Sequence, residues 1–163
     1  MKHSQIDSTC VRPRFDWVEL KSGILVQSTE DAAGFDIIYP HDEPLHMPAG
    51  KLIRIPTGVI TKMAPNMVGI MKEKSGQSLK GIEVKAGVID HSYNQEWSVV
   101  AKWVPPSPEA AEASKVFTIT KGMKVAQVIF IALPSLTLLG DGFKLESVER
   151  TGGFGSSGTH LKA

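Results

Sequence analysis

Five short segments of the sequence carry the side chains that could bind and hydrolyse a phosphorylated ligand. They combine carboxylates, lysines, one arginine, hydroxyls and glycines, in the order AAGFDI (32–37), EKSGQSLKGI (73–82), AGVIDHSYNQE (86–96), KGMKVAQ (121–127) and RTGGFGSSG (150–158). Cations, hydroxyls and main-chain amides bind phosphate oxygens, and a carboxylate beside them can activate water as a general base. The combination indicates a ligand with an anionic end.

The third segment contains the candidate for that base, Asp90. An aspartate by itself more often lies in a turn and accepts hydrogen bonds from main-chain amides. Near bound phosphates a carboxylate is a poor binding group, because like charges repel, but a sensible base. Beside the other four segments we therefore favour the base. Ala86 and Gly87 are small enough for the main chain to approach a ligand closely, and Tyr93 would otherwise be a partly buried aromatic residue of a sheet.

The second, first and fourth segments supply further polar candidates, each with a simpler alternative. Main-chain amides around Ser75 and Gly76, with the Ser75 hydroxyl, would cradle phosphate oxygens, or Ser75 would be the N-cap of a short helix. Asp36 would alternatively be a structural carboxylate in a turn. Gln127 lies in an apolar segment, so its buried amide would need hydrogen-bond partners.

The segment 150–160 differs in composition from the rest of the chain. Four glycines, two serines and two threonines fill eight of its eleven positions, so it cannot bury enough apolar surface to offset the entropy of ordering. It would be a frayed terminus, as most termini are, or a glycine-rich arm. Phe154 and Arg150 suit an arm that closes over a ligand with a flat face and an anionic end. We predict a mobile arm at 149–163.

Short strands must position these segments. Apolar and polar residues alternate in 51–62 and again in 97–103, as in half-buried strands. The segments 116–120 and 125–133 predict further strands, and the second is nearly all apolar, as a fully buried strand would be. Glycine and proline recur at short intervals, which is typical of an all-β sandwich or barrel.

Helical periodicity is scarce. We expect one short helix within 75–80 and an exposed loop or single turn at 105–114, where the sequence is PPSPEAAEAS. Nothing repeats internally. We predict a single domain over 1–163 that begins with an N-terminal extension at 1–17.

The composition argues against several classes of protein. The 163 residues are enough to bury a core without staples, and 18 basic against 17 acidic residues disfavour a general nucleic-acid binder. Cys10 is the only cysteine, and no Cys/His pairs have zinc spacing. Apolar runs fall short of the ~20 residues of a membrane helix, and the polar N-terminus lacks a signal-peptide core. We expect a cytoplasmic protein with no membrane or nucleic-acid partner.

Taken together, the five segments resemble the five motifs of the trimeric dUTPase family, which occur in this order at similar spacing. The resemblance runs from Ala32 to Gly158, and its third and fifth segments are the most diagnostic. It implies a β-clip, or distorted jelly-roll barrel, that assembles as a homotrimer with shared active sites. It also implies hydrolysis of dUTP to dUMP and pyrophosphate, with Mg²⁺ held through substrate phosphates and water rather than by a direct protein ligand.

The resemblance assigns roles to individual residues. Asp90 would activate the water that attacks the α-phosphorus, Asp36 would organise water near the phosphates, and Tyr93 would pack under the deoxyribose and exclude a 2′-hydroxyl. On the arm, Arg150 would contact the γ-phosphate and Phe154 would stack on uracil. The implied substrate-binding residues are Lys74, Ser75, Gly76, Gly87, Val88, Ile89, Tyr93, Gln127, Arg150, Phe154, Gly155, Ser156 and Ser157.

Some residues depart from the family pattern. Glu73 and Lys74 replace the usual Pro-Arg pair, and a lysine keeps the charge but loses the bidentate fork of arginine. Gln95 stands where a glycine is usual, and Lys124 stands where an arginine is frequent. The Glu73-Lys74 pair and the extra loop at 105–114 motivate an alternative, a dUTPase-fold nucleotide-binding regulatory protein with weak catalysis. A dCTP deaminase is disfavoured, because Val100 occupies the position of its catalytic glutamate.

Overall fold

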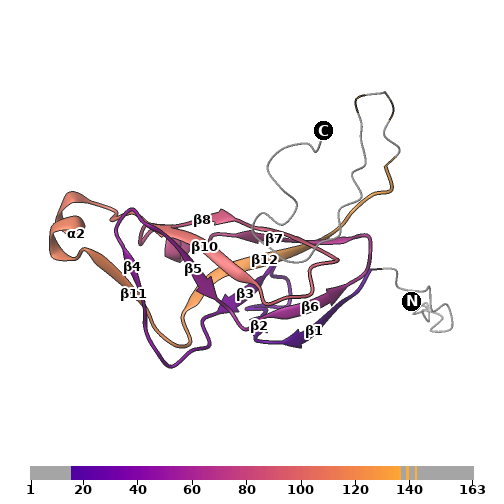
Figure 1. Cartoon of the computed structure of the whole chain (residues 1–163), viewed down its shortest axis with the longest axis horizontal. Helices are drawn as coiled ribbons and strands as arrows, with labels where there is room; N and C mark the ends of the chain where they lie inside the picture. Colours follow the sequence, from indigo (N-terminus) through magenta and orange to yellow (C-terminus); the bar gives the residue numbers. More distant parts are fainter. Residues whose placement is uncertain (1–15, 137–138, 140–141, 143–163) are drawn as a thin grey trace, which may run out of the picture.

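A computed structural model of the chain describes residues 16–136, 139 and 142, which form an antiparallel β fold with two short helices (Figure 1). The elements are β1 (Val18–Ser22), β2 (Leu25–Val26), β3 (Phe35–Ile38), β4 (Leu45–Pro48), β5 (Leu52–Pro56), β6 (Ile60–Met63), β7 (Met67–Lys72), α1 (Ser75–Ser78), β8 (Ile82–Ala86), β9 (Val88–Asp90), β10 (Ser98–Trp103), α2 (Pro108–Ala113), β11 (Val116–Ile119) and β12 (Lys124–Ala132). The predicted arm lies outside the described residues, as does nearly all of the predicted N-terminal extension.

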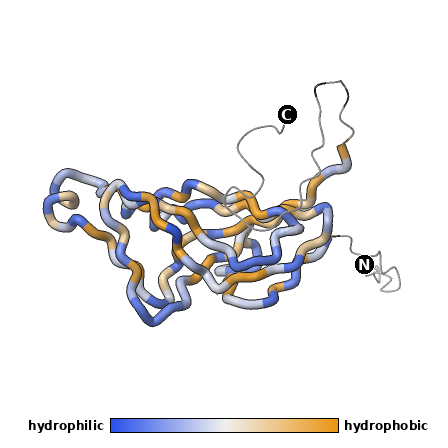
Figure 2. The backbone as a smooth tube through the Cα atoms, in the orientation of Figure 1, coloured by the Kyte–Doolittle hydropathy of each residue, from blue (hydrophilic) through white to orange (hydrophobic). Residues whose placement is uncertain are grey.

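Two sheets enclose the core. A five-stranded sheet has the order β2-β3-β12-β7-β9 and a three-stranded sheet has the order β5-β10-β8, with β1-β6 and β11-β4 as additional pairs. Buried side chains of both larger sheets belong to one hydrophobic cluster, and the rings of Trp97 and Phe130 lie 6.1 Å apart within it. Figure 2 shows apolar stretches along the strands and hydrophilic stretches mainly in the connections. The all-β, jelly-roll-like prediction is confirmed.

The strand predictions differ in how well they hold. Trp97, Val99 and Ala101 are completely buried, as their alternation predicted. The segment 51–62 contains two strands, β5 and β6, separated by a turn. The segment 125–133 becomes β12, whose first half is buried, but Ile131 is 44% exposed. A fully buried strand was therefore wrong for the second half of β12, which extends past the core.

The two helices arise from local signals. α1 falls inside the segment predicted to be helical. α2 occupies the segment expected to be a loop or single turn, because the Ser107 side chain accepts a hydrogen bond from the Ala110 amide and Pro108 opens the helix. α2 buries no residue and lies at the end of the molecule beside β4 and β11 (Figure 1). Neither helix in the described part of the chain has the length and hydropathy needed to cross a membrane.

Candidate functional site

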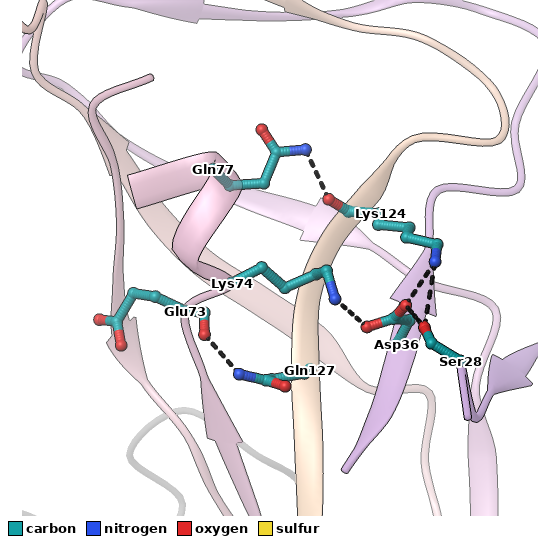
Figure 3. A network of polar contacts seen from close by, with 7 residues as sticks. All are labelled: Ser28, Asp36, Glu73, Lys74, Gln77, Lys124 and Gln127. Atoms are coloured by element: carbon teal, nitrogen blue, oxygen red, sulfur yellow. Dashed lines mark hydrogen bonds and ion pairs between the residues drawn. The ribbon is translucent and has the colours of Figure 1, made fainter. Parts of the chain in front are cut away.

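Three of the five segments meet around the carboxylate of Asp36 (Figure 3). Asp36 lies on β3 and is 3% exposed, so the alternative of a turn carboxylate is wrong. Its Oδ1 contacts the Lys74 ammonium, and its Oδ2 lies 2.7 Å from the Lys124 ammonium. The Ser28 hydroxyl donates a 2.8 Å hydrogen bond to the same Oδ2. We call these four residues, Ser28, Asp36, Lys74 and Lys124, the Asp36 cluster.

The Asp36 cluster carries a surplus positive charge. Burial alone would raise the pKa of Asp36, but hydrogen bonds from Lys124, Lys74 and Ser28 outweigh it and lower the pKa from 3.8 to about 2. Two ammonium groups therefore face one carboxylate that is ionised at neutral pH. The Lys124 side chain remains 44% exposed and the Lys74 side chain 25% exposed. Both cations are held in place and still accessible to an anion.

Two glutamine side chains join the second segment to the fourth, each by a bond to the main chain of the other segment. The Gln127 side-chain amide donates to the Glu73 carbonyl at 2.8 Å. This is the hydrogen-bond partner that we expected for an amide in an apolar segment. The Gln77 amide donates to the Lys124 carbonyl at 2.7 Å. These bonds fix α1 and the preceding Lys74 against β12, so the geometry of the cluster depends on both.

Ser75 and Gly76 form the exposed start of α1. The N-cap residue is Lys74, and no side chain caps the helix, so the N-cap interpretation of Ser75 is wrong. A Cβ atom added to Gly76 would meet nothing within 4 Å. The packing of the described residues therefore does not require glycine at this position, which leaves both residues as candidates for ligand contacts.

Asp90 lies at the end of β9, the edge strand of the five-stranded sheet. It is half-buried, and its carbonyl accepts a 3.0 Å hydrogen bond from the Tyr93 amide. Tyr93 packs against the core. Gly87 is required by the fold, because the Met71 amide donates to its carbonyl at 2.7 Å and an added Cβ would lie 2.7 Å from the Met71 oxygen. We expected this close approach toward a ligand, but it is made to the main chain of β7.

Within one chain, the Asp36 cluster and Asp90 are far apart. Asp36 is in register with Gln127 and, through it, with Lys72, whereas Asp90 is in register with Val68. β3 and β9 are separated by three strand spacings, about 14 Å, and Lys72 and Val68 by four residues, about 13 Å along the strand. The structure thus brings together the first, second and fourth segments but leaves Asp90 of the third segment away from them.

Val88 and Ile89 lie on β9, and the five predicted residues of the fifth segment fall in another part of the chain. Arg150, Phe154, Gly155, Ser156 and Ser157 all lie outside the described residues. In the part of the chain that is described, no group of three or more His, Cys, Asp or Glu side chains is arranged to hold a metal ion.

A family model described as dUTPase matches residues 21–158. The chain belongs to the dUTPase family. The deoxyuridine 5′-triphosphate nucleotidohydrolase of Rickettsia akari is 30% identical to it over 134 residues, which cover 80% of this chain and 85% of that protein.

Solved dUTPases share the fold. The dUTPase of Staphylococcus bacteriophage 80alpha with dUPNHPP has a TM-score of 0.64 at 21% identity and covers 88% of this chain and 99% of that chain. The dUTPase of phage phi11 of S. aureus, described with a structural Mg(II) ion, has a TM-score of 0.64 at 16% identity and covers 78% of this chain and 97% of that chain. The family and fold predicted from the sequence are confirmed.

Two members of the Asp36 cluster were not among the predicted site residues. Lys124 lies three residues before Gln127 in the fourth segment, so its motif could have pointed to it. Ser28 lies outside all five segments and reaches Asp36 only because β2 pairs with β3. No pattern in the sequence predicts this contact.

Proposed function

We propose that this chain hydrolyses dUTP to dUMP and pyrophosphate. Membership of the dUTPase family supports the reaction, and the Asp36 cluster is the observation that carries its phosphate end. Its net positive charge lies directly beside the exposed Ser75 and Gly76, and ammonium, hydroxyl and main-chain donors together suit phosphate oxygens. In this proposal Lys74, Ser75 and Gly76 bind the triphosphate, and Gln127 holds their main chain in position.

The two carboxylates of the site would have different tasks. Asp36 has a pKa of about 2 and is engaged by two ammonium groups and a hydroxyl, so it is a weak proton acceptor and serves to orient the lysines and nearby water. Asp90 ends the edge strand β9, about three strand spacings from Asp36, and its segment resembles the dUTPase motif that supplies the base. Asp90 is therefore our general base, which takes a proton from the water that attacks the α-phosphorus as pyrophosphate leaves.

The third segment would read the nucleoside. β9 pairs with β7 on one side only, as far as the described residues extend, and Val88 is 68% exposed. The outer edge of β9 can therefore present the Gly87 amide and main-chain groups of Val88 and Ile89 to uracil, while the Gly87 carbonyl is bonded to the Met71 amide. A cytosine would leave such buried groups unpaired, which discriminates strongly. Tyr93, beside this edge, would pack under deoxyribose and exclude a 2′-hydroxyl.

The separation of Asp90 from the Asp36 cluster supports sites shared between chains. A base and the cations that hold the reacting phosphates must be within a few Å of one substrate, with reacting atoms about 3–3.5 Å apart. One chain does not meet this condition, so Asp90 of one protomer would complete the Asp36 cluster of another in a homotrimer. The arm at 149–163 would close over the site, with Arg150 and Ser156–Ser157 on phosphates and Phe154 on uracil.

Magnesium fits this site as a companion of the substrate. Mg²⁺ usually keeps several waters and binds substrate phosphates with few carboxylates. In the Asp36 cluster the one carboxylate is already engaged by two ammonium groups and a hydroxyl, so the cluster suits phosphates rather than a cation. When bound to the triphosphate, Mg²⁺ would neutralise charge that develops on the leaving pyrophosphate. The residues of this chain would orient that complex and exclude water.

The test is pyrophosphate release measured with dUTP, UTP, dCTP and dTTP at saturating Mg²⁺. We expect turnover of dUTP and kcat/KM at least about a hundredfold lower for dCTP, whose amine mismatches the main-chain edge, and for UTP, whose 2′-hydroxyl the Tyr93 ring excludes. The rate with dTTP measures how far the site also rejects a base that differs from uracil only by a methyl group. Binding of dUTP without turnover would identify a regulatory protein instead.

Deleting 149–163 should leave the thermal midpoint and trimer mass unchanged and strongly reduce turnover. Unchanged turnover would exclude the closing arm.

A further inference from the structure

Glu96 ties the third segment to a distant turn and has no role in the site proposed above. Its Oε1 accepts hydrogen bonds from the main-chain amides of Thr57 at 3.0 Å and Gly58 at 2.8 Å. These amides belong to the turn between β5 and β6. One carboxylate oxygen therefore satisfies two donors nearly forty residues away in the sequence.

The turn that Glu96 grips is itself rigidly held. Thr57 is completely buried, and its hydroxyl donates to the Trp97 carbonyl at 2.7 Å and accepts from the Val59 amide at 3.1 Å. The Trp97 amide donates to the Val59 carbonyl at 2.8 Å. On the other side, the Ser22 hydroxyl donates to the Gly58 carbonyl at 2.7 Å. Because the turn is held on both sides, the hydrogen bonds from its amides fix the position of the Glu96 side chain.

The main chain of Glu96 holds the ring of Tyr93 by a hydrogen bond. The Tyr93 hydroxyl donates to the Glu96 carbonyl at 3.2 Å, while the two residues between them, Asn94 and Gln95, are exposed and belong to no strand or helix. The main-chain bond from the Tyr93 amide to Asp90 holds the near end of the residue. The position of the Tyr93 hydroxyl is therefore fixed relative to the 57–58 turn through Glu96.

We propose that Glu96 is a positioning residue for sugar selection. By anchoring its own main chain to the 57–58 amides, it sets where the Tyr93 ring lies, and thereby how closely the ring approaches the C2′ position of the nucleotide. This inference rests on the proposed function, in which Tyr93 packs under deoxyribose. It predicts that sugar discrimination depends on a residue whose side chain faces away from the substrate.

The chemistry of the contact supplies matched variants. In Glu96→Gln the amide oxygen can still accept from both main-chain amides, so the anchor remains. In Glu96→Ala both amides lose their acceptor, which is unfavourable for buried donors, and the 93–96 link is released. Tyr93→Phe keeps the ring and removes only the bond to the Glu96 carbonyl. A supporting residue of this kind acts through geometry rather than through direct contact.

The experiment measures kcat/KM for dUTP and for UTP, with Mg²⁺, in the wild type and in all three variants. We expect the dUTP/UTP ratio to fall about tenfold in Glu96→Ala, to fall at least about threefold in Tyr93→Phe, and to stay within about twofold of the wild type in Glu96→Gln. Thermal midpoints measured in parallel report folding.

Two results would overturn the inference. One is an unchanged dUTP/UTP ratio in Glu96→Ala, with both substrates slowed equally, because a purely structural role would act in that way. The other applies even if Glu96→Ala does not fold: an unchanged ratio in Tyr93→Phe would show that the bond to Glu96 does not position the ring. A wild-type protein that hydrolyses neither nucleotide, or both equally, would instead contradict the proposed function itself.

Discussion

The Asp36 cluster and the Asp90 edge are built on opposite principles. The cluster gathers side-chain charges from β3, from the residue before α1 and from β12 around one buried carboxylate. At the Asp90 edge, which is β9 with Gly87 and Tyr93, the geometry comes from the main chain. β9 pairs with one strand among the described residues, Gly87 packs against β7, and Tyr93 is bonded at both ends to backbone atoms. Charge attraction is tolerant of exact side-chain identity, whereas main-chain recognition depends on the fold. The Asp36 cluster therefore suits a triphosphate, and the Asp90 edge suits the uracil and the deoxyribose.

The largest effect should come from removing the proposed base. Asp90→Asn keeps the shape of the side chain but removes its capacity to accept a proton, so kcat should fall by about 10²–10⁴ while dUTP binding persists. Stopped-flow pyrophosphate release and calorimetric titration with a non-hydrolysable dUTP analogue measure the two properties separately. Wild-type turnover by this variant would transfer the role of base to another group.

Mixing inactive chains tests whether the two regions work in different protomers. Asp90→Asn and Lys74→Ala chains would each be inactive alone. If every site takes Lys74 from one chain and Asp90 from its neighbour, random mixing leaves about a quarter of the sites with both residues intact. Refolded or co-expressed mixtures should therefore regain roughly that share of the wild-type rate.

The control for mixing is an Asp90→Asn, Lys74→Ala double-variant chain combined with wild type, which dilutes sites without complementing them. Recovery that stays at the background of the separate variants would mean that one chain supplies both residues.

Sequence reasoning succeeded where the pattern was local and less where contacts were long-range. Alternation located β10 and the buried face with Trp97 and Val99, and motif order identified the family. It missed Ser28, because no spacing rule links a serine before β3 to a carboxylate inside it. It also assigned the constraint on Gly87 to a ligand, because the packing partner, Met71, is known only once β7 is placed.

The cluster should also show itself in the pH dependence of stability. The pKa of Asp36 is lowered from 3.8 to about 2 in the folded state, so its contribution is present above pH 4 and is lost as the pH falls toward 2. A shift of this size corresponds to about 2 kcal/mol. Asp36→Asn should therefore be less stable than wild type by about that amount at pH 7, with the difference becoming small near pH 2 and vanishing below it.

Urea unfolding at several pH values measures this difference, and Asp42→Asn is the matched control. Asp42 also faces a lysine, at 2.7 Å from the Lys121 ammonium, but its side chain is 85% exposed. Exposed pairs of this kind contribute little to stability, so the control should unfold almost as the wild type does. An Asp36→Asn curve parallel to wild type from pH 7 to pH 2 would contradict the ionic interpretation of the cluster.

The smallest effect is expected from Lys74→Arg, which asks how tolerant the cluster is. Lys74 engages Asp36 Oδ1, while Lys124 and Ser28 occupy Oδ2. A guanidinium can bond Oδ1 with one N–H and keep others for a phosphate oxygen, so the fork should be useful rather than disruptive. We expect kcat/KM for dUTP to stay level or to rise up to about threefold.

Lys72→Arg is the control, because Lys72 pairs with Glu73 at 3.4 Å, outside the cluster, and is 56% exposed. A loss greater than about tenfold in Lys74→Arg alone would mean that the compact ammonium is itself required. In that case the phosphate end would depend on exact side-chain geometry as much as the Asp90 edge does, and the contrast between the two regions would fail.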